Sequence, residues 1–186
     1  MRSIVTLIRE GVLDPELAAL LWLLAGSGVP VHVTSEDAEV ARTTAAGLSP
    51  LSSRSDGVSY GAGGMLEEVL RQPVPLRPAT GAVVIVREGR VVAAHFHRPP
   101  LRDAGGHVRP QGPAVLATWD PAREAWEHFA WGVIPELAAA AGHRPGDFEI
   151  EHGRRREYLA ALAGSRLAGA EIVAALAGYA VATPPQ

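Results

Sequence analysis

The order of segments between residues 14 and 131 predicts an α/β fold. Residues 14–16, Asp-Pro-Glu, begin a helix, because Asp caps a helix, Pro fits its first turn and Glu favours its N-terminus. The apolar run after them predicts a helix to residue 25, followed by a short buried strand at 29–34 and a second helix at 36–48. Two β-hairpins then follow, so helices and strands share the chain.

Turn chemistry predicts the two hairpins. Residues 82–86 and 91–96 flank Arg-Glu-Gly-Arg, in which Gly suits a tight hairpin turn. Residues 114–119 and 125–131 flank a turn that begins Asp-Pro. The sequence therefore predicts a four-stranded antiparallel meander, interrupted by a Pro-, Gly- and Arg-rich excursion at 99–113.

We expect one compact unit built from three parts. Residues 1–80 form a reduced, nucleotide-loop-like helix–strand–helix part, with a Ser- and Gly-rich loop at 49–64 and a short helix at 65–71. Residues 81–132 form the antiparallel meander, and residues 133–186 form a helical tail. The tail helices are expected at 135–141, 154–163 and 170–180.

The composition excludes several kinds of chemistry. All 17 basic residues are Arg, so the chain has no Lys, and it also has no Cys. A catalytic Cys, a thiolate metal site, a disulfide and a Lys nucleophile are therefore excluded. A working Walker A loop is excluded too, because its Lys contacts the nucleotide phosphates. We expect no cofactor, and the absence of a recognisable catalytic motif favours a protein that is not an enzyme.

Charge and hydropathy restrict the partners. The net charge is −3, and the excess of Arg in residues 71–123, 8 against 3 acidic residues, is too small to indicate nucleic-acid binding. The longest apolar run, residues 17–25, is about half the length that a membrane-spanning helix needs. We expect a cytoplasmic protein without membrane insertion.

Three stretches occur in an order that resembles a known superfamily. They are TLIREGVLDPELAALLWLLAGSGVPVHVTS at 6–35, EDAEVARTTAAGL at 36–48 and LATWDPAREAWEHF at 116–129, the last followed by a helical tail at 154–184. Together they resemble the type II/type IV secretion and pilus-assembly ATPases. The resemblance implies a shortened α/β ATPase-like fold, in which residues 36–48 occupy the position of the phosphate loop and its helix.

This phosphate-loop position departs from the superfamily pattern. Ser35 stands roughly where a Gly is expected, and Arg42 precedes Thr43 and Thr44 in place of the Lys. Arg is a planar fork and replaces a phosphate-binding Lys poorly. The acidic side chains of residues 36, 37 and 39 also repel a triphosphate where backbone N–H groups should face it. We therefore interpret the loop as degenerate; a nucleotide binder without hydrolysis is a weaker alternative.

A second constellation points to a different class of protein. His95 and His97 alternate along one predicted strand, and Asp103 and His107 follow shortly after it. Imidazole and carboxylate groups suit zinc or iron, so a small metal-dependent enzyme is the alternative function. The competing interpretation is that these side chains are polar surface groups in a chain that lacks Lys.

Arginine and tryptophan side chains provide a candidate partner surface. Arg98, Arg102 and Arg109 lie in the excursion and suit an acidic partner, although solvated loop charges also explain them. Trp119 and Trp126 fall on the second hairpin, where a cross-strand pair or an aromatic partner patch is possible.

The leading hypothesis is a non-catalytic, ATPase-like protein that acts through protein–protein interaction, and the resemblance implies association with a secretion or pilus-assembly system. A four-stranded meander has exposed edges, and the Ala-rich tail helices bury little area each. We therefore expect another protein or a second copy of the chain to complete the surface.

Overall fold

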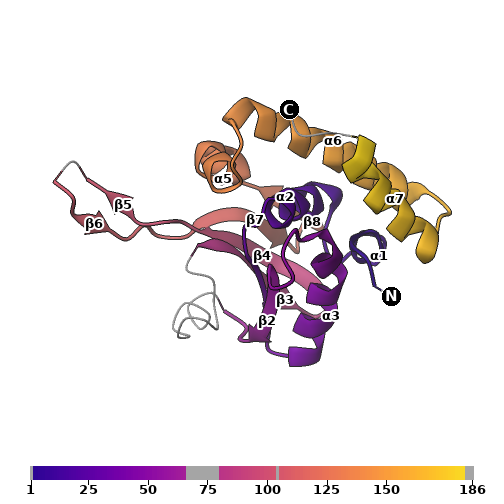
Figure 1. Ribbon diagram of the computed structural model, residues 1–186. Helices are drawn as coiled ribbons and strands as arrows, with labels where there is room; N and C mark the ends of the chain where they lie inside the picture. Colours follow the sequence, from indigo (N-terminus) through magenta and orange to yellow (C-terminus); the bar gives the residue numbers. More distant parts are fainter. Residues whose placement is uncertain (1, 66–79, 104, 183–186) are drawn as a thin grey trace.

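The fold is a mixed six-stranded sheet with helices packed on it, seen in a computed structural model that describes residues 2–65, 80–103 and 105–182 (Figure 1). The helix expected at 65–71 lies outside the described residues, except for its first residue. The strand order is β2-β1-β3-β4-β7-β8. The strands are β1 (Val31–Ser35), β2 (Val58–Ala62), β3 (Gly81–Arg87), β4 (Arg90–His97), β7 (Ala114–Asp120) and β8 (Ala125–His128).

Pairing directions divide the sheet into two halves. β1 runs parallel to β2 and β3, whereas β3, β4, β7 and β8 pair antiparallel in sequence order. The predicted α/β class and the four-stranded meander are confirmed. Because β1 pairs directly with β3, the N-terminal part and the meander share one sheet.

Both predicted hairpin turns are also confirmed. Glu88 and Gly89 have φ angles of 50° and 75°, the left-handed pair that a two-residue hairpin turn requires. In the second turn, the Asp120 carboxylate accepts a hydrogen bond of 2.8 Å from the Ala122 N–H. That contact is the Asx-type turn that the Asp-Pro sequence predicted.

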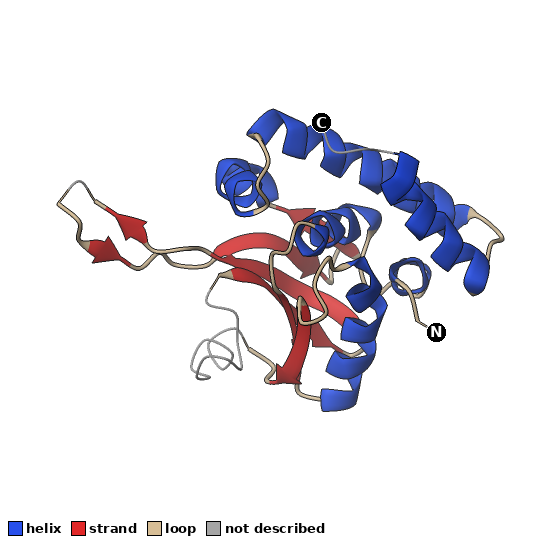
Figure 2. Cartoon of the chain, in the orientation of Figure 1, coloured by secondary structure: helices blue, strands red, loops and turns tan. Residues whose placement is uncertain are grey.

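The helices lie beside the sheet and extend into the C-terminal region (Figure 2). They are α1 (Ile4–Arg9), α2 (Pro15–Gly26), α3 (Ala38–Leu48), α5 (Ile134–Ala140), α6 (Pro145–Gly164) and α7 (Ala170–Ala182), with 3-10 turns at Ser49–Leu51 and Ala130–Val133. Within the described residues, no helix is both long enough and apolar enough to cross a bilayer.

Three predicted boundaries were wrong. The loop expected at 49–64 contains β2, an edge strand paired on one side only and therefore largely exposed, so its sequence lacks a buried alternation. The helix expected at 154–163 begins at Pro145, because Phe148 is buried in the core and fixes a first turn that is otherwise polar. The strand expected at 125–131 ends at His128, where a 3-10 turn follows.

Helix α2 is buried around its whole circumference. All nine residues from Leu17 to Ala25 are buried, including Trp22. They belong to one core cluster that also contains residues from α1, α3, α5, α6 and α7 and from one face of the sheet. On the other face, Val83 and Ile85 form a separate small cluster with Val92 and Ala93. The main core therefore lies between the sheet and the helices, with α2 at its centre.

Two polar side chains, Asp14 and Arg9, fix the ends of this helical layer. The Asp14 carboxylate caps α2 by accepting from the Leu17 N–H at 2.9 Å, and its other oxygen lies 2.7 Å from Nε2 of His128 at the end of β8. At the far end of α6, the Arg9 guanidinium donates to the carbonyls of Leu162, Ala163, Ser165 and Leu167. The N-terminal helix therefore supplies the C-terminal cap of α6.

The contact between His128 and Asp14 gives a pH-dependent contribution to stability. Burial opposes protonation of His128, but the hydrogen bond to Asp14 and the negative charges of Asp14 and Glu16 outweigh it, so its pKa is raised. A raised folded-state pKa stabilises the fold fully below the unfolded-state pKa and ceases to do so as pH rises through the folded-state value.

We therefore expect the stability advantage of the wild type over His128→Gln to shrink as pH rises from about 6 to about 8. Urea unfolding of both proteins across this range measures the difference directly. Asp14→Ala should lose the same dependence and a further ~1 kcal/mol from the helix cap. An advantage that stays constant or grows with pH would contradict this account of His128.

Candidate functional site

The loop between β1 and α3, interpreted from the sequence as a degenerate phosphate loop, is short. Only Glu36 and Asp37 separate the end of β1 at Ser35 from the start of α3 at Ala38. A phosphate-binding loop of the Walker type wraps the phosphates with a longer run of backbone N–H groups before its helix begins. The short loop makes a direct turn from strand to helix.

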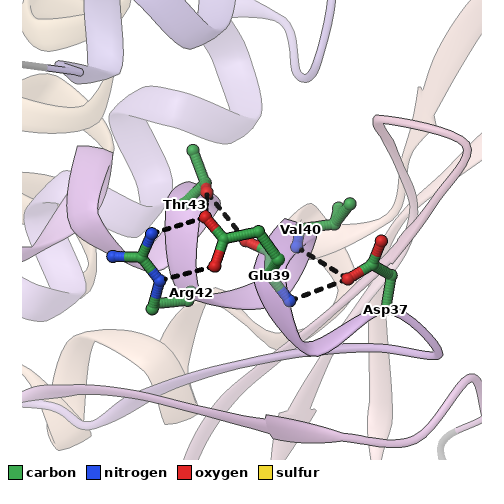
Figure 3. A network of polar contacts seen from close by, with 5 residues as sticks. All are labelled: Asp37, Glu39, Val40, Arg42 and Thr43. Atoms are coloured by element: carbon green, nitrogen blue, oxygen red, sulfur yellow. Dashed lines mark hydrogen bonds and ion pairs between the residues drawn. The ribbon is translucent and has the colours of Figure 1, made fainter.

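The N-terminus of α3 is already occupied by a carboxylate of the chain itself (Figure 3). Asp37 accepts hydrogen bonds from the backbone N–H groups of Glu39 at 2.8 Å and Val40 at 3.4 Å. Its own N–H donates to Ser35 Oγ at 3.3 Å. These helical N–H groups are the donors that would bind an anion, so Asp37 takes the place that a phosphate would need.

Arg42 points toward Glu39, one turn earlier on α3, and not toward the loop. Its Nε and Nη2 atoms donate to the two carboxylate oxygens of Glu39 at 2.8 and 2.5 Å, and Thr43 Oγ1 donates to the Glu39 carbonyl at 2.7 Å. The Arg42 hydrogen bond holds the pKa of Glu39 below its usual value. Thr44, in contrast, is buried against the core. Of the four predicted loop residues, Arg42 and Thr43 both contact Glu39, and Ser35 joins them through Asp37.

The carboxyl ends of parallel strands are where α/β proteins commonly bind ligands, and β1 lies here between the parallel strands β2 and β3. In this structure, contacts within the chain occupy the end of β1. The Gly63 N–H donates to the Ser35 carbonyl at 3.0 Å, and Arg87 Nε donates to the Gly64 carbonyl at 3.1 Å. Glu36 packs over Gly64 so closely that a Cβ there would lie 2.4 Å from its carboxylate.

The predicted metal ligands fall into two separate places. His95 and His97 lie on β4 in the six-stranded sheet. Asp103 and His107 lie at the end of a hairpin formed by β5 (Leu101–Arg102) and β6 (Val108–Arg109), where Asp103 Oδ2 is 3.1 Å from His107 Nδ1. Among the residues that the structure describes, no three His, Asp or Glu side chains form a group that could hold a metal ion.

The excursion between β4 and β7 is a two-stranded arm that projects from the sheet (Figure 1). Two of the predicted partner residues, Arg102 and Arg109, lie on its strands. Arg98 lies at its root, where Nε donates to the Gly112 carbonyl at 2.8 Å and Nη1 is 3.4 Å from the carboxylate of Glu136 on α5. Arg98 therefore braces the arm, whereas Arg102 and Arg109 make no ion pair within the described part of the chain.

The two tryptophans are used inside the fold. Trp119 and Trp126 are direct cross-strand partners with ring centroids 4.5 Å apart in an edge-to-face arrangement, as the sheet interpretation predicted. Trp126 Nε1 donates to the Val91 carbonyl at 2.8 Å, and the Arg90 guanidinium lies 4.0 Å from the Trp119 ring centroid. These contacts stabilise the meander through aromatic and cation–π interactions.

Sequence reasoning missed two features. Trp131 is 77% exposed, because it follows β8 in a 3-10 turn and not in the strand expected there. His32 is buried in β1 beside Ser59 of β2, with 3.0 Å between Nδ1 and Oγ, and burial lowers its pKa. A regular alternation of buried and exposed residues at 58–62 would have indicated a strand beside His32. The exposed edge strand has no such alternation, so the pair of His32 and Ser59 was not indicated by this signal.

Comparison with known proteins adds no family to this description. No protein-family model matches the chain, and no curated protein matches it.

The separation of the predicted ligands gives a direct test of the metal alternative. We expect purified protein to contain no stoichiometric zinc or iron, and a strong chelator to leave its Tm unchanged. Elemental analysis and thermal unfolding with and without the chelator provide the two measurements. One metal ion per chain, lost in a His95→Ala/His97→Ala variant, would instead support the metal-dependent enzyme.

Proposed function

We propose that this chain is a non-catalytic, ATPase-like protein that acts in the cytoplasm by binding other proteins. The observation that carries the proposal is the N-terminus of α3, where the Asp37 carboxylate accepts the hydrogen bonds that a nucleotide phosphate would need. The strand–loop–helix unit has the architecture of a phosphate site, but its donors are satisfied within the chain.

Charge around the loop supports the same proposal. Glu36 and Asp37 fill the turn, and Glu39 follows in the first turn of α3, so three carboxylates surround the helix N-terminus. The nearest cation on α3, Arg42, is held by Glu39. Repulsion between these carboxylates and a triphosphate opposes binding at the place where a functional loop attracts it.

The class of partner follows from the sequence resemblance. Residues 6–35, 36–48 and 116–129 resemble secretion and pilus-assembly ATPases. A protein that keeps this architecture without a phosphate site can pack against a nucleotide-binding relative without competing for its nucleotide. We therefore propose a component of a secretion or pilus-assembly system as partner.

The nucleotide part of the proposal predicts no effect of ATP on stability. A ligand present at 100 times its Kd raises the unfolding free energy by ~2.7 kcal/mol, so thermal unfolding in millimolar ATP and Mg²⁺ detects even weak specific binding. We expect no change in Tm for the wild type. We also expect none for Arg42→Ala, which removes the only cation near the loop on α3.

An upward shift in Tm for the wild type that disappears in Arg42→Ala would overturn the proposal. Calorimetric titration with a secretion or pilus-assembly ATPase from the same cell tests the partner class. Saturable binding is expected, and no heat with any such ATPase at about 100 µM would remove the proposed partner.

A further inference from the structure

The β5–β6 arm presents apolar and cationic side chains together on both of its faces. Leu101 pairs with Arg109, and Arg102 pairs with Val108, so each face carries one apolar and one cationic side chain. Leu101 and Val108 are 58% and 52% exposed. Both are among the most exposed of the large apolar side chains in the described part of the molecule.

Hydrogen bonds hold the arm in a defined shape. At its tip, Asp103 Oδ1 accepts from the N–H groups of Gly105 and His107, both at 2.9 Å. At its root, Gln111 Nε2 donates across the arm to the Pro99 carbonyl at 2.8 Å, parallel to the contact between Arg98 and Gly112. An isolated two-stranded hairpin is only marginally stable in water, so these contacts pre-organise a surface that would otherwise be flexible.

A groove lies beside the root of the arm. It has a volume of about 490 Å³ and lies between the arm, the segments that lead into β1 and β3, and helix α5. Its lining is mainly apolar and includes Val29, Pro30, Pro99, Pro100, Leu101 and Ala139. The arm and the groove are adjacent parts of one surface, which suits a two-fold interface in which each copy offers both.

Charge indicates what this surface binds. Residues 98–113 contain three Arg and one Asp, whereas the rest of the chain contains fourteen Arg and nineteen acidic residues. A basic arm on an acidic body is complementary to another copy of the same chain. The acidic body repels nucleic acid and anionic lipid surfaces, which are the other partners that a basic arm attracts.

We propose that the arm mediates two-fold self-association, in which the arm of each copy lies in the root groove of the other, against its acidic body. Leu101 and Val108 supply the apolar contact, and Arg102 and Arg109 reach carboxylates of the other copy. This inference rests on the proposed protein-binding function and names one partner for it, a second copy of this chain.

The test is sedimentation and light scattering of the full chain at concentrations up to about 100 µM, which detects a dimer with a Kd of roughly that size. We expect the wild type to dimerise and Leu101→Glu/Val108→Glu to weaken association by at least about tenfold. Ile150→Glu is the matched control, because Ile150 on α6 is 57% exposed and lies outside the arm. It should dimerise as the wild type does.

A second variant, Arg102→Glu/Arg109→Glu, separates the charge contribution from the apolar one. We expect weaker dimerisation at low salt and a smaller response to added salt than in the wild type. A wild type that is monomeric at about 100 µM would overturn the self-association proposal, and so would a dimer that both arm variants leave unchanged. Neither result would affect the ATP measurement, and an ATP-induced rise in Tm would refute the proposed function without altering the outcome for the arm.

Discussion

Burial of α2 on every side is the constraint on which the other elements depend. A surface helix buries one stripe and leaves the opposite face in water, but here every position from Leu17 to Ala25 is buried. Such a helix needs neighbours all around it, and the sheet, α1, α5, α6 and α7 supply them. The C-terminal helices are therefore part of the core rather than an appendage, which explains why Phe148 and Leu159 of α6 are fully buried.

The need to satisfy the backbone N–H groups at the start of α3 explains the loop after β1. A strand that leads directly into a helix leaves unpaired N–H groups at the helix start, and a protein can satisfy them with a bound anion or with a side chain. This chain uses Asp37 for that purpose, and Glu36 and Arg87 both contact Gly64 beside it. Stability and phosphate binding compete for one set of donors, and here the donors serve stability.

The sequence was most informative where a local pattern determines the structure. The helix start at residues 14–16 and the turns at Glu88-Gly89 and Asp120-Pro121 each depend on a few neighbouring residues, and the structure has them at these positions. β2 was missed because an exposed edge strand is specified by its pairing with β1, which is a long-range contact. The start of α6 was missed for a similar reason, since its first turn is stabilised by burial of Phe148.

In the candidate site, too, some features could be predicted from residue types and others could not. The acidic character of the loop after β1 was evident from residue types, because charge and the absence of Lys do not depend on the fold. The shape of the excursion was not evident. Its Pro and Gly content indicated a loop, whereas Asp103, Gln111 and Arg98 fix it as a projecting arm through hydrogen bonds between residues on opposite sides of the hairpin.

The Arg9 cap also affects how the molecule is made. Its acceptors lie 153 to 158 residues further along the chain, so a ribosome has translated all of these residues before the contact can form. Until then α2 has no α6 to cover it, and its apolar surface is open to chaperones or to aggregation. Contacts at such long sequence separation form late in folding, and a contact made after the transition state chiefly slows unfolding. A late-forming contact of Arg9 therefore contributes more to how long the native state lasts than to how quickly it is reached.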